Sequence, residues 1–139
     1  MAKNKINTGR LFLIPSMLGD TLPGEVLPEE IRNRASQLKY FIVEELRTAR
    51  RFLKKLDKST DIDALQFFVL NEHTDPAEIP GMLKPLADGL DMGLLSEAGM
   101  PCIADPGSGL VSAAHAHGIR VIPLSGPSSI SLALAASGF

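Results

Sequence analysis

The chain has 139 residues, of which 45% are hydrophobic and 22% charged, and its formal net charge at pH 7 is −2. This length predicts one soluble domain with a single core, and the slightly acidic balance excludes a global attraction to nucleic acid, so any RNA contact needs a local basic patch. The single Cys102 excludes an intramolecular disulfide, and no apolar run resembles a signal peptide or is long enough to span a bilayer. We therefore expect a cytoplasmic protein without membrane association.

Five short apolar runs alternate with helical patterns along the chain. The expected strands are residues 11–14, 40–43, 67–70, 93–95 and 120–124. The expected helices are residues 28–37, 47–56, 76–88, 107–117 and 127–137, several of which have Pro in the first turn. Gly89 and Gly118 follow two of them, where glycine commonly ends a helix. This alternation predicts an α/β fold with three layers, α/β/α, around a five-stranded, mainly parallel sheet.

The loop after the first expected strand contains Gly19 and Asp20. A glycine beside a carboxylate at the carboxyl end of a strand can bring backbone close to a ligand, but an ordinary turn uses the same residues. The residues alone favour the turn.

The second expected strand runs into a segment in which acidic residues precede basic ones, Glu44-Glu45-Leu46-Arg47-Thr48-Ala49-Arg50-Arg51. One interpretation is a solvated helix start stabilised by charges three and four residues apart. The other is a basic patch in which Arg47, Arg50 and Arg51 contact phosphates. Both interpretations stay open.

A polar loop with Glu72 and His73 follows the third expected strand, ahead of Pro76. Thr74 or Asp75 is the expected N-cap of the next helix. A histidine beside a carboxylate also resembles a pair of metal ligands, but no second pair at ligand spacing accompanies it. We therefore expect no metal.

The fourth and fifth expected strands each run into a loop of small residues. These loops read Ser-Glu-Ala-Gly-Met-Pro-Cys-Ile-Ala-Asp-Pro-Gly over residues 96–107 and Ser-Gly-Pro-Ser-Ser over residues 125–129. Small residues let backbone groups approach a ligand, and open parallel sheets bind ligands beyond the carboxyl ends of their strands. The two loops therefore predict one ligand site, with tight turns that bind nothing as the alternative. Neither a Gly-x-Gly-x-x-Gly motif nor a lysine-containing phosphate loop is present, which disfavours a generic nucleotide-binding domain.

These segments, in this order and spacing, resemble the tetrapyrrole methylase superfamily of S-adenosylmethionine-dependent methyltransferases. Within it, the chain is most similar to the ribosomal small-subunit RNA (cytidine-2'-O-)-methyltransferases, where the corresponding segments read Ser-Asp-Ala-Gly-Thr-Pro, Ser-Asp-Pro-Gly and Pro-Gly-Pro-Ser-Ala. The resemblance implies that residues 1–139 are the N-terminal domain of a longer protein whose C-terminal domain is absent from this sequence. It also implies S-adenosyl-L-methionine as cofactor, a ribose 2'-hydroxyl of small-subunit ribosomal RNA as methyl acceptor, and a homodimer of the intact protein.

The resemblance also implies roles for individual positions. The implied cofactor contacts are Leu18, Ala98, Gly99, Met100, Ile103, Ser128 and Ser129. The implied substrate contacts are Gly19, Asp20, Arg47, Arg50 and Arg51, and the candidates for the base that accepts the acceptor's proton are Glu44, Glu72 and His73. Cys102 is expected to be a packing residue, because methyl transfer from a sulfonium needs no covalent intermediate.

Other functions stay open. The first loop lacks the glycine-rich form found in the superfamily, which keeps a tetrapyrrole methyltransferase as an alternative to an RNA methyltransferase. A non-catalytic paralogue that keeps the fold as a binding module is a third possibility. Methyl transfer to a defined RNA separates these functions.

Overall fold

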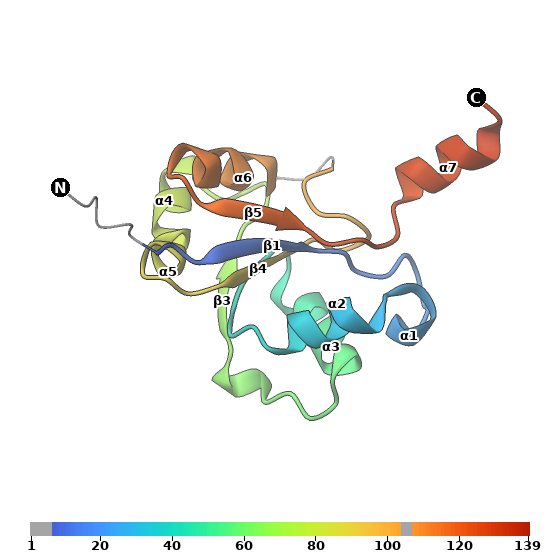
Figure 1. Ribbon diagram of the computed structural model, residues 1–139, viewed down its shortest axis with the longest axis horizontal. Coiled ribbons are helices and arrows are strands. Elements are labelled where there is room, and N and C mark those ends of the chain that lie inside the picture. The colour runs from blue at the N-terminus through green and yellow to red at the C-terminus, as the bar shows by residue number, and fades with distance from the viewer. Residues whose placement is uncertain (1–6, 104–106) are drawn as a thin grey trace.

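A single parallel sheet organises the computed structural model, which describes residues 7–103 and 107–139 (Figure 1). Its five strands lie in the order β3-β2-β4-β1-β5, and every neighbouring pair is parallel. The strands are β1 (Arg10–Ile14), β2 (Tyr40–Val43), β3 (Gln66–Val69), β4 (Met92–Leu95) and β5 (Arg120–Pro123). The five expected strands and the α/β fold are confirmed, with strand ends that differ from the expected ones by one residue at most.

Helices cover both faces of the sheet, as Figure 1 shows. On one face lie α1 (Pro23–Val26), α2 (Glu29–Ser36) and α3 (Leu46–Leu56). On the other lie α4 (Ile79–Met82), α5 (Lys84–Ala87) and α6 (Gly107–Ala116). Two short 3-10 turns, η1 (Ile62–Ala64) and η2 (Pro76–Glu78), precede β3 and α4.

The core follows the alternation of side chains along each strand. Phe12 and Ile14 of β1 belong to the buried cluster that contains residues of α2 and α3. Leu11 and Leu13 belong to the cluster on the opposite face, with residues of α5 and α6. Because successive strand residues point to opposite faces, one buried strand supplies two separate apolar layers.

Prolines divide one of the expected helices and end the additional helix α1. The expected helix over residues 76–88 is instead η2, α4 and α5, with Pro80 and Pro85 at the starts of the last two. Proline has no backbone N–H and clashes with the carbonyl four residues earlier, so each one starts a new short helix rather than continuing the old one. The extra helix α1 ends at Leu27, which is extended (φ −110°, ψ 128°) because it precedes Pro28.

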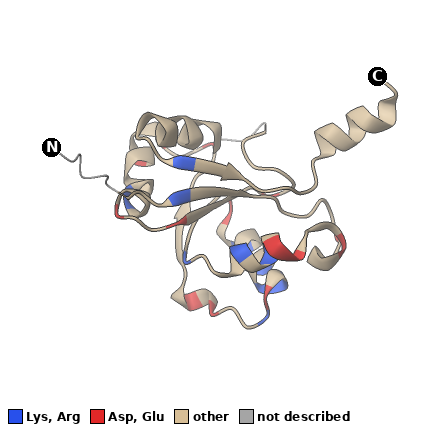
Figure 2. Ribbon diagram, viewed as in Figure 1, with Lys and Arg blue, Asp and Glu red and all other residues tan. Residues whose placement is uncertain are grey.

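The helix α7 (Ser129–Ser137) projects from the body of the molecule (Figure 1). All of its residues are exposed, including Ile130, Leu132 and Leu134, each more than half exposed. Figure 2 shows that it carries no charged residue, whereas α2 carries both signs and α3 carries only basic residues. Within the described ranges, no helix combines the length and the apolar character needed to cross a membrane.

Candidate active site

The loops after β1, β4 and β5 meet at one edge of the sheet, because these strands are neighbours and their carboxyl ends point the same way. The backbone N–H of Ser16, after β1, donates to the carbonyl oxygen of Gly99, after β4, at 3.0 Å. The Ser16 hydroxyl donates to the carbonyl oxygen of Ser96 at 3.4 Å. A Cβ atom at Gly126, after β5, would overlap the ring of Pro15. The three loops are therefore packed against one another.

Gly99 lies where these loops come closest. Its φ of +69° is in the left-handed region, which side-chain-bearing residues rarely adopt. A Cβ atom there would lie 3.0 Å from Leu18 Cδ2 and 3.2 Å from the carbonyl oxygen of Pro127. Both the backbone conformation and the surrounding atoms therefore favour glycine at this position.

The other expected cofactor contacts of the β4 loop lie around Gly99. Met100 is half-buried, as is Leu18 of the β1 loop, whereas Ala98 is exposed. Ile103 is 46% exposed, which is unusual for a side chain of its size and gives the edge an apolar surface. Residues 104–106, the Ala-Asp-Pro part of the motif that ends at Gly107, lie outside the described residues.

The β5 loop leads directly into α7. The Ser128 hydroxyl accepts from the backbone N–H of Ser131 at 3.5 Å and is the N-cap of the helix. Ser129 occupies the first helical position and is exposed. The two expected serines thus lie at a helix start on the same edge as Gly99.

Cys102 has a φ of +68°. In the part of the chain that the structure describes, it is the single non-glycine residue with a positive φ. Holding such a residue in this region costs about 1–2 kcal/mol. Backbone strain of this kind gathers at functional sites. The Cys102 side chain is half-buried and packs against the core cluster on the α6 face, in agreement with a packing role.

The three candidate bases are not brought together. Glu44 Oε2 accepts from the backbone N–H of Glu97 at 3.3 Å, so Glu44 lies beside the β4 loop. Glu72 and His73 follow β3, which lies two strands away from β4, a separation of about 10 Å at the usual strand spacing. Their side chains are 84% exposed, and His73 Nε2 lies 3.4 Å from Glu72 Oε1.

The start of α3 is capped by Glu45. Its carboxylate accepts from the backbone N–H groups of Arg47 at 3.1 Å and Thr48 at 2.6 Å, and from the Thr48 hydroxyl at 2.6 Å. These bonds, led by the one from the Thr48 hydroxyl, lower the pKa of Glu45. Since these N–H groups already have a partner, an anion near α3 would be bound by side chains rather than by the helix start.

The expected arginines of α3 point in different directions. The guanidinium carbon of Arg50 lies 5.8 Å from the centre of the Phe67 ring of β3. Arg47 is exposed. Arg51 lines a hollow of about 200 Å³ between α3 and the loops after β1 and β4, here named the α3 hollow. Its polar lining comes from Ser16, Gly19, Thr48, Arg51, Lys55 and Glu97.

The α3 hollow joins two expected substrate contacts and adds residues that the sequence analysis did not place in the site. Gly19 and Arg51 both line it, and Asp20 follows Gly19 on the surface. Lys55 and Glu97 are the charged residues among these additions. The helical spacing of Arg51 and Lys55, four residues apart, is the signal that places Lys55 on the same face of α3.

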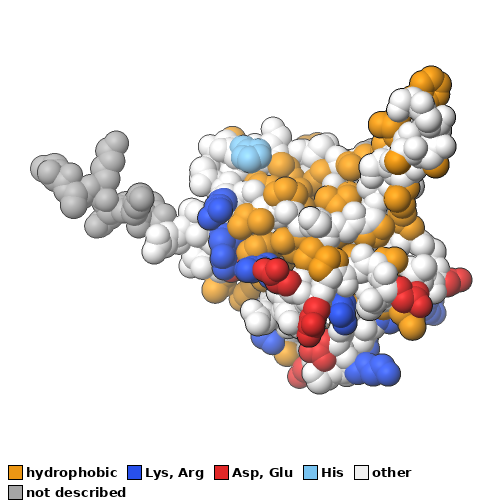
Figure 3. Space-filling view, turned by 45° about the vertical axis from the view of Figure 1, so that its right-hand side comes forward, with side chains coloured by type: hydrophobic (Ala, Val, Ile, Leu, Met, Phe, Trp, Pro, Cys, Tyr) orange, Lys and Arg blue, Asp and Glu red, His pale blue; other side chains and the backbone are white. Residues whose placement is uncertain are grey.

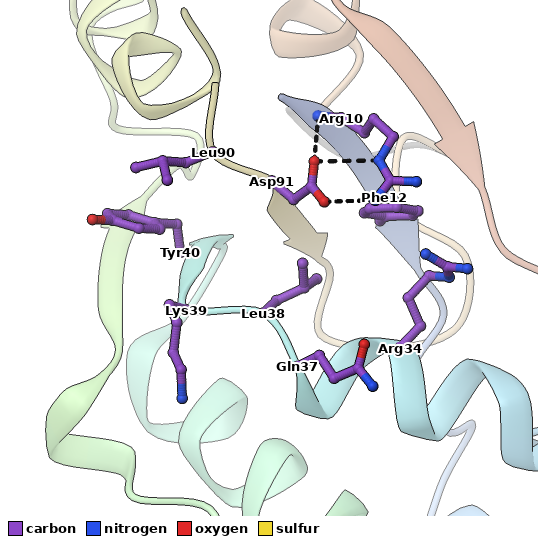
Figure 4. Close-up of a pocket in the computed structure, with 9 residues that line it drawn as sticks. All are labelled: Arg10, Phe12, Arg34, Gln37, Leu38, Lys39, Tyr40, Leu90 and Asp91. Carbon is purple, nitrogen blue, oxygen red and sulfur yellow. Dashed lines mark hydrogen bonds and ion pairs between the residues drawn. The ribbon is translucent and has the colours of Figure 1, made fainter. Parts of the chain in front are cut away.

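A second pocket, of about 280 Å³, lies at the opposite edge, where the strands begin (Figure 4). Arg10 Nη2 lies 2.8 Å from Asp91 Oδ2, and the Arg10 backbone N–H also donates to Asp91. These contacts, led by the side-chain bond from Arg10, lower the pKa of Asp91. The guanidinium of Arg34 lies over the Phe12 ring at 5.0 Å, and Figure 4 shows the Lys39 amine pointing away.

The residues that line this pocket therefore link β1 to the segment before β4 and to α2. Ligands of open α/β sheets bind at the carboxyl ends of the strands, which places the candidate site at the Gly99 edge and the α3 hollow. In residues 7–103 and 107–139, no group of three or more His, Cys, Asp or Glu side chains could hold a metal ion.

The chain is similar to known proteins over most of its length. No family model matches the chain. It is 31% identical over 128 residues to the Vibrio cholerae protein named Ribosomal RNA small subunit methyltransferase I, which covers 92% of this chain and 42% of that protein. Proteins of the same name from Streptococcus pyogenes and Escherichia coli O157:H7 are also 31% identical, over 98% and 94% of the chain and 45% and 43% of their own lengths. The chain spans about half the length of these curated relatives. It is therefore a homologue, over 92–98% of its own length, of about half of each of these proteins named ribosomal RNA small subunit methyltransferase I.

Proposed function

We propose that this protein is part of an S-adenosylmethionine-dependent methyltransferase that methylates a ribose 2'-hydroxyl of small-subunit ribosomal RNA. The observation that carries the proposal is the packing of the loops after β1, β4 and β5 around Gly99 in a chain whose relatives are named for methylation of that RNA. The relatives cited above are all named for ribosomal RNA, which favours RNA over a tetrapyrrole as acceptor.

The residues at the Gly99 edge fit the cofactor's chemistry. Leu18, Met100 and Ile103 offer partly exposed apolar surface for an adenine ring and a methionine side chain. The hydroxyls of Ser128 and Ser129 stand at the same edge for polar groups of the ligand. When bound, the cofactor supplies an activated methyl group, and the protein's residues align it with the acceptor oxygen.

Among the candidate bases, we assign the acceptor's proton to Glu44. Its carboxylate touches the β4 loop through the backbone N–H of Glu97, whereas Glu72 and His73 start from a strand at the far edge of the sheet. A general base has to come within hydrogen-bond reach of the proton that it removes, so position decides before pKa.

We also propose that α7 and the surface beside it are covered by the rest of the protein. Figure 3 shows hydrophobic side chains gathered over the upper part of one face as far as the projecting helix, with charged side chains below. Monomeric proteins rarely leave large apolar patches in water, and the relatives are about twice as long as this chain. The additional length of the relatives supplies an occupant. A homodimer formed through α7 is the alternative outcome.

Methyl transfer tests the proposed function. The complete gene product is incubated with radiolabelled S-adenosylmethionine and an in vitro transcript of small-subunit ribosomal RNA assembled into subunits. A labelled 2'-O-methyl nucleoside in the nuclease digest is the expected result.

Calorimetry should show cofactor binding by the complete protein and much weaker binding by residues 1–139, because half of the site leaves one side of the ligand in water. Absence of cofactor binding by the complete protein, or label in a tetrapyrrole but not in RNA, would overturn the proposal.

A further inference from the structure

We propose that the α3 hollow binds a backbone phosphate of the RNA strand that carries the methyl acceptor, and that Arg51 and Lys55 together hold this phosphate. This inference rests on the proposed function, because it names the place where the substrate touches the same edge of the sheet. It separates one pair of basic residues on α3 from the others.

Arg51 and Lys55 share one face of α3. They are four residues apart, so their side chains lie one above the other, and Thr48 lies on the same face one turn earlier. The opposite wall of the hollow is made by Ser16 and Gly19 of the β1 loop and by Glu97 of the β4 loop. The hollow therefore lies between a basic helix face and two of the loops of the cofactor site.

The charges of the hollow favour an anion. Across the described ranges the ion pairs are Arg10 with Asp91, Glu72 with His73, and Lys84 with Asp88. Neither Arg51 nor Lys55 takes part in one, so both charges are available. Glu97 is the single acidic residue that lines the hollow, which leaves an excess of positive charge. Arginine offers paired N–H groups to a phosphate, and lysine adds a mobile point charge.

The size and position of the hollow favour one group of a larger ligand. Its volume of about 200 Å³ is below the roughly 300–1,000 Å³ of sites that enclose a whole small molecule. Ser16 lines the hollow, and its backbone N–H also donates to the carbonyl oxygen of Gly99, at the edge proposed to bind the cofactor. A strand whose phosphate occupies the hollow therefore runs past the place proposed for the methyl donor.

The neighbouring basic pair on α3 is engaged elsewhere. The Arg50 guanidinium lies over the Phe67 ring, and Lys54 Nζ donates to the carbonyl oxygen of Thr60 at 2.8 Å. Neither residue lines the hollow. Arg50 and Lys54 have the same charge and the same four-residue spacing as Arg51 and Lys55, one position earlier. They provide a matched control for a general electrostatic effect.

The test compares Arg51→Gln/Lys55→Gln with Arg50→Gln/Lys54→Gln in the complete protein. Binding to the small-subunit ribosomal RNA transcript is measured over a series of salt concentrations. Phosphate contacts release counterions, so the first variant should lose about tenfold or more in affinity and flatten the plot of log K against log salt by about one to two units. The second variant should change the slope by less than half as much, and cofactor affinity should stay constant in both.

Further outcomes keep the two proposals apart. The charge-preserving variant Arg51→Lys/Lys55→Arg should restore most of the salt dependence, and equal thermal unfolding midpoints exclude a folding defect. Equal slope changes in the two glutamine variants would overturn the phosphate site while leaving methyl transfer intact. A complete protein that transfers no methyl group but still shows the difference between the variants would refute the proposed function and retain the phosphate site.

Discussion

Replacing Gly99 with alanine tests whether the three loops are packed around this residue. Alanine at a φ of +69° costs about 1–2 kcal/mol of folding free energy, because its Cβ is too close to the following carbonyl. The Cβ would also lie 3.0 Å from Leu18 Cδ2 and 3.2 Å from the carbonyl oxygen of Pro127. The Leu18 side chain can turn aside but the Pro127 carbonyl is backbone, so overpacking adds about 1 kcal/mol. We expect a total loss of about 2–3 kcal/mol.

Gly118 provides the matched control. Its φ of +70° is nearly the same, but a Cβ atom there would meet no heavy atom within 4 Å. The variant Gly118→Ala therefore reports the backbone cost alone. The free energy of unfolding is measured by urea denaturation followed by circular dichroism, and cofactor affinity is measured by calorimetry. Gly99→Ala should be the less stable of the two and should bind S-adenosylmethionine more weakly, whereas Gly118→Ala should keep its affinity.

Two results would refute this reasoning. Equal losses of stability in the two variants would show that Gly99 is not a point of contact between the loops. A Gly99→Ala protein with undiminished cofactor affinity would show that the edge around Gly99 is not where the cofactor binds. The first result concerns packing and the second concerns function, so each can occur without the other.

Two further predictions concern pH. Asp91→Asn should lower the melting temperature at pH 7, because bonds from Arg10 depress the pKa of Asp91. The stability that Asp91 contributes is present above about pH 4 and is lost as the pH falls through the lowered pKa. The melting temperatures of the two proteins should therefore converge in acid. A constant difference down to pH 2 would contradict it. Glu45→Gln should likewise weaken the start of α3 at pH 7, because the Thr48 hydroxyl and two N–H groups depress the pKa of Glu45. Thermal unfolding at pH 7 and at pH 2 checks this, since the variant should match the parent only in acid.

The strands were predictable because each is a short run rich in apolar residues and bounded by turn residues, and their parallel direction follows from the helices between them. The division of the expected helix over residues 76–88 was not predicted, because the helical pattern of its apolar residues outweighed Pro80 and Pro85 in the prediction. The break itself is visible in the sequence, because Pro80 and Pro85 lack the backbone N–H that a continuous helix needs.

The candidate site could be predicted only as far as the loops. Small residues after the fourth and fifth expected strands indicated where backbone approaches a ligand, and those loops do meet at Gly99. The positions of Glu72 and His73 depend on the strand order, which places β3 at the far edge and which local sequence does not contain. The direction of a surface side chain is similarly non-local. Arg50 turns toward Phe67 because β3 pairs with β2 there, and Arg51 is left facing the hollow.

The strand order explains why the two proposed ligand regions lie side by side. The chain leaves β1 toward the face that carries α1, α2 and α3, and it leaves the adjacent β4 toward α6 on the opposite face. Where neighbouring parallel strands send their connections to opposite faces, a crevice opens at their carboxyl ends, and ligands bind there. Gly99 and Ser16 stand on the two sides of this division, joined by one hydrogen bond. Met100 and Ile103, two of the residues proposed to contact the cofactor, follow β4, while Arg51 and Lys55 lie on the α3 side. We therefore propose that RNA approaches over α3. Changes at Gly99 and at Arg51 should then affect different steps, cofactor binding in the first case and RNA binding in the second.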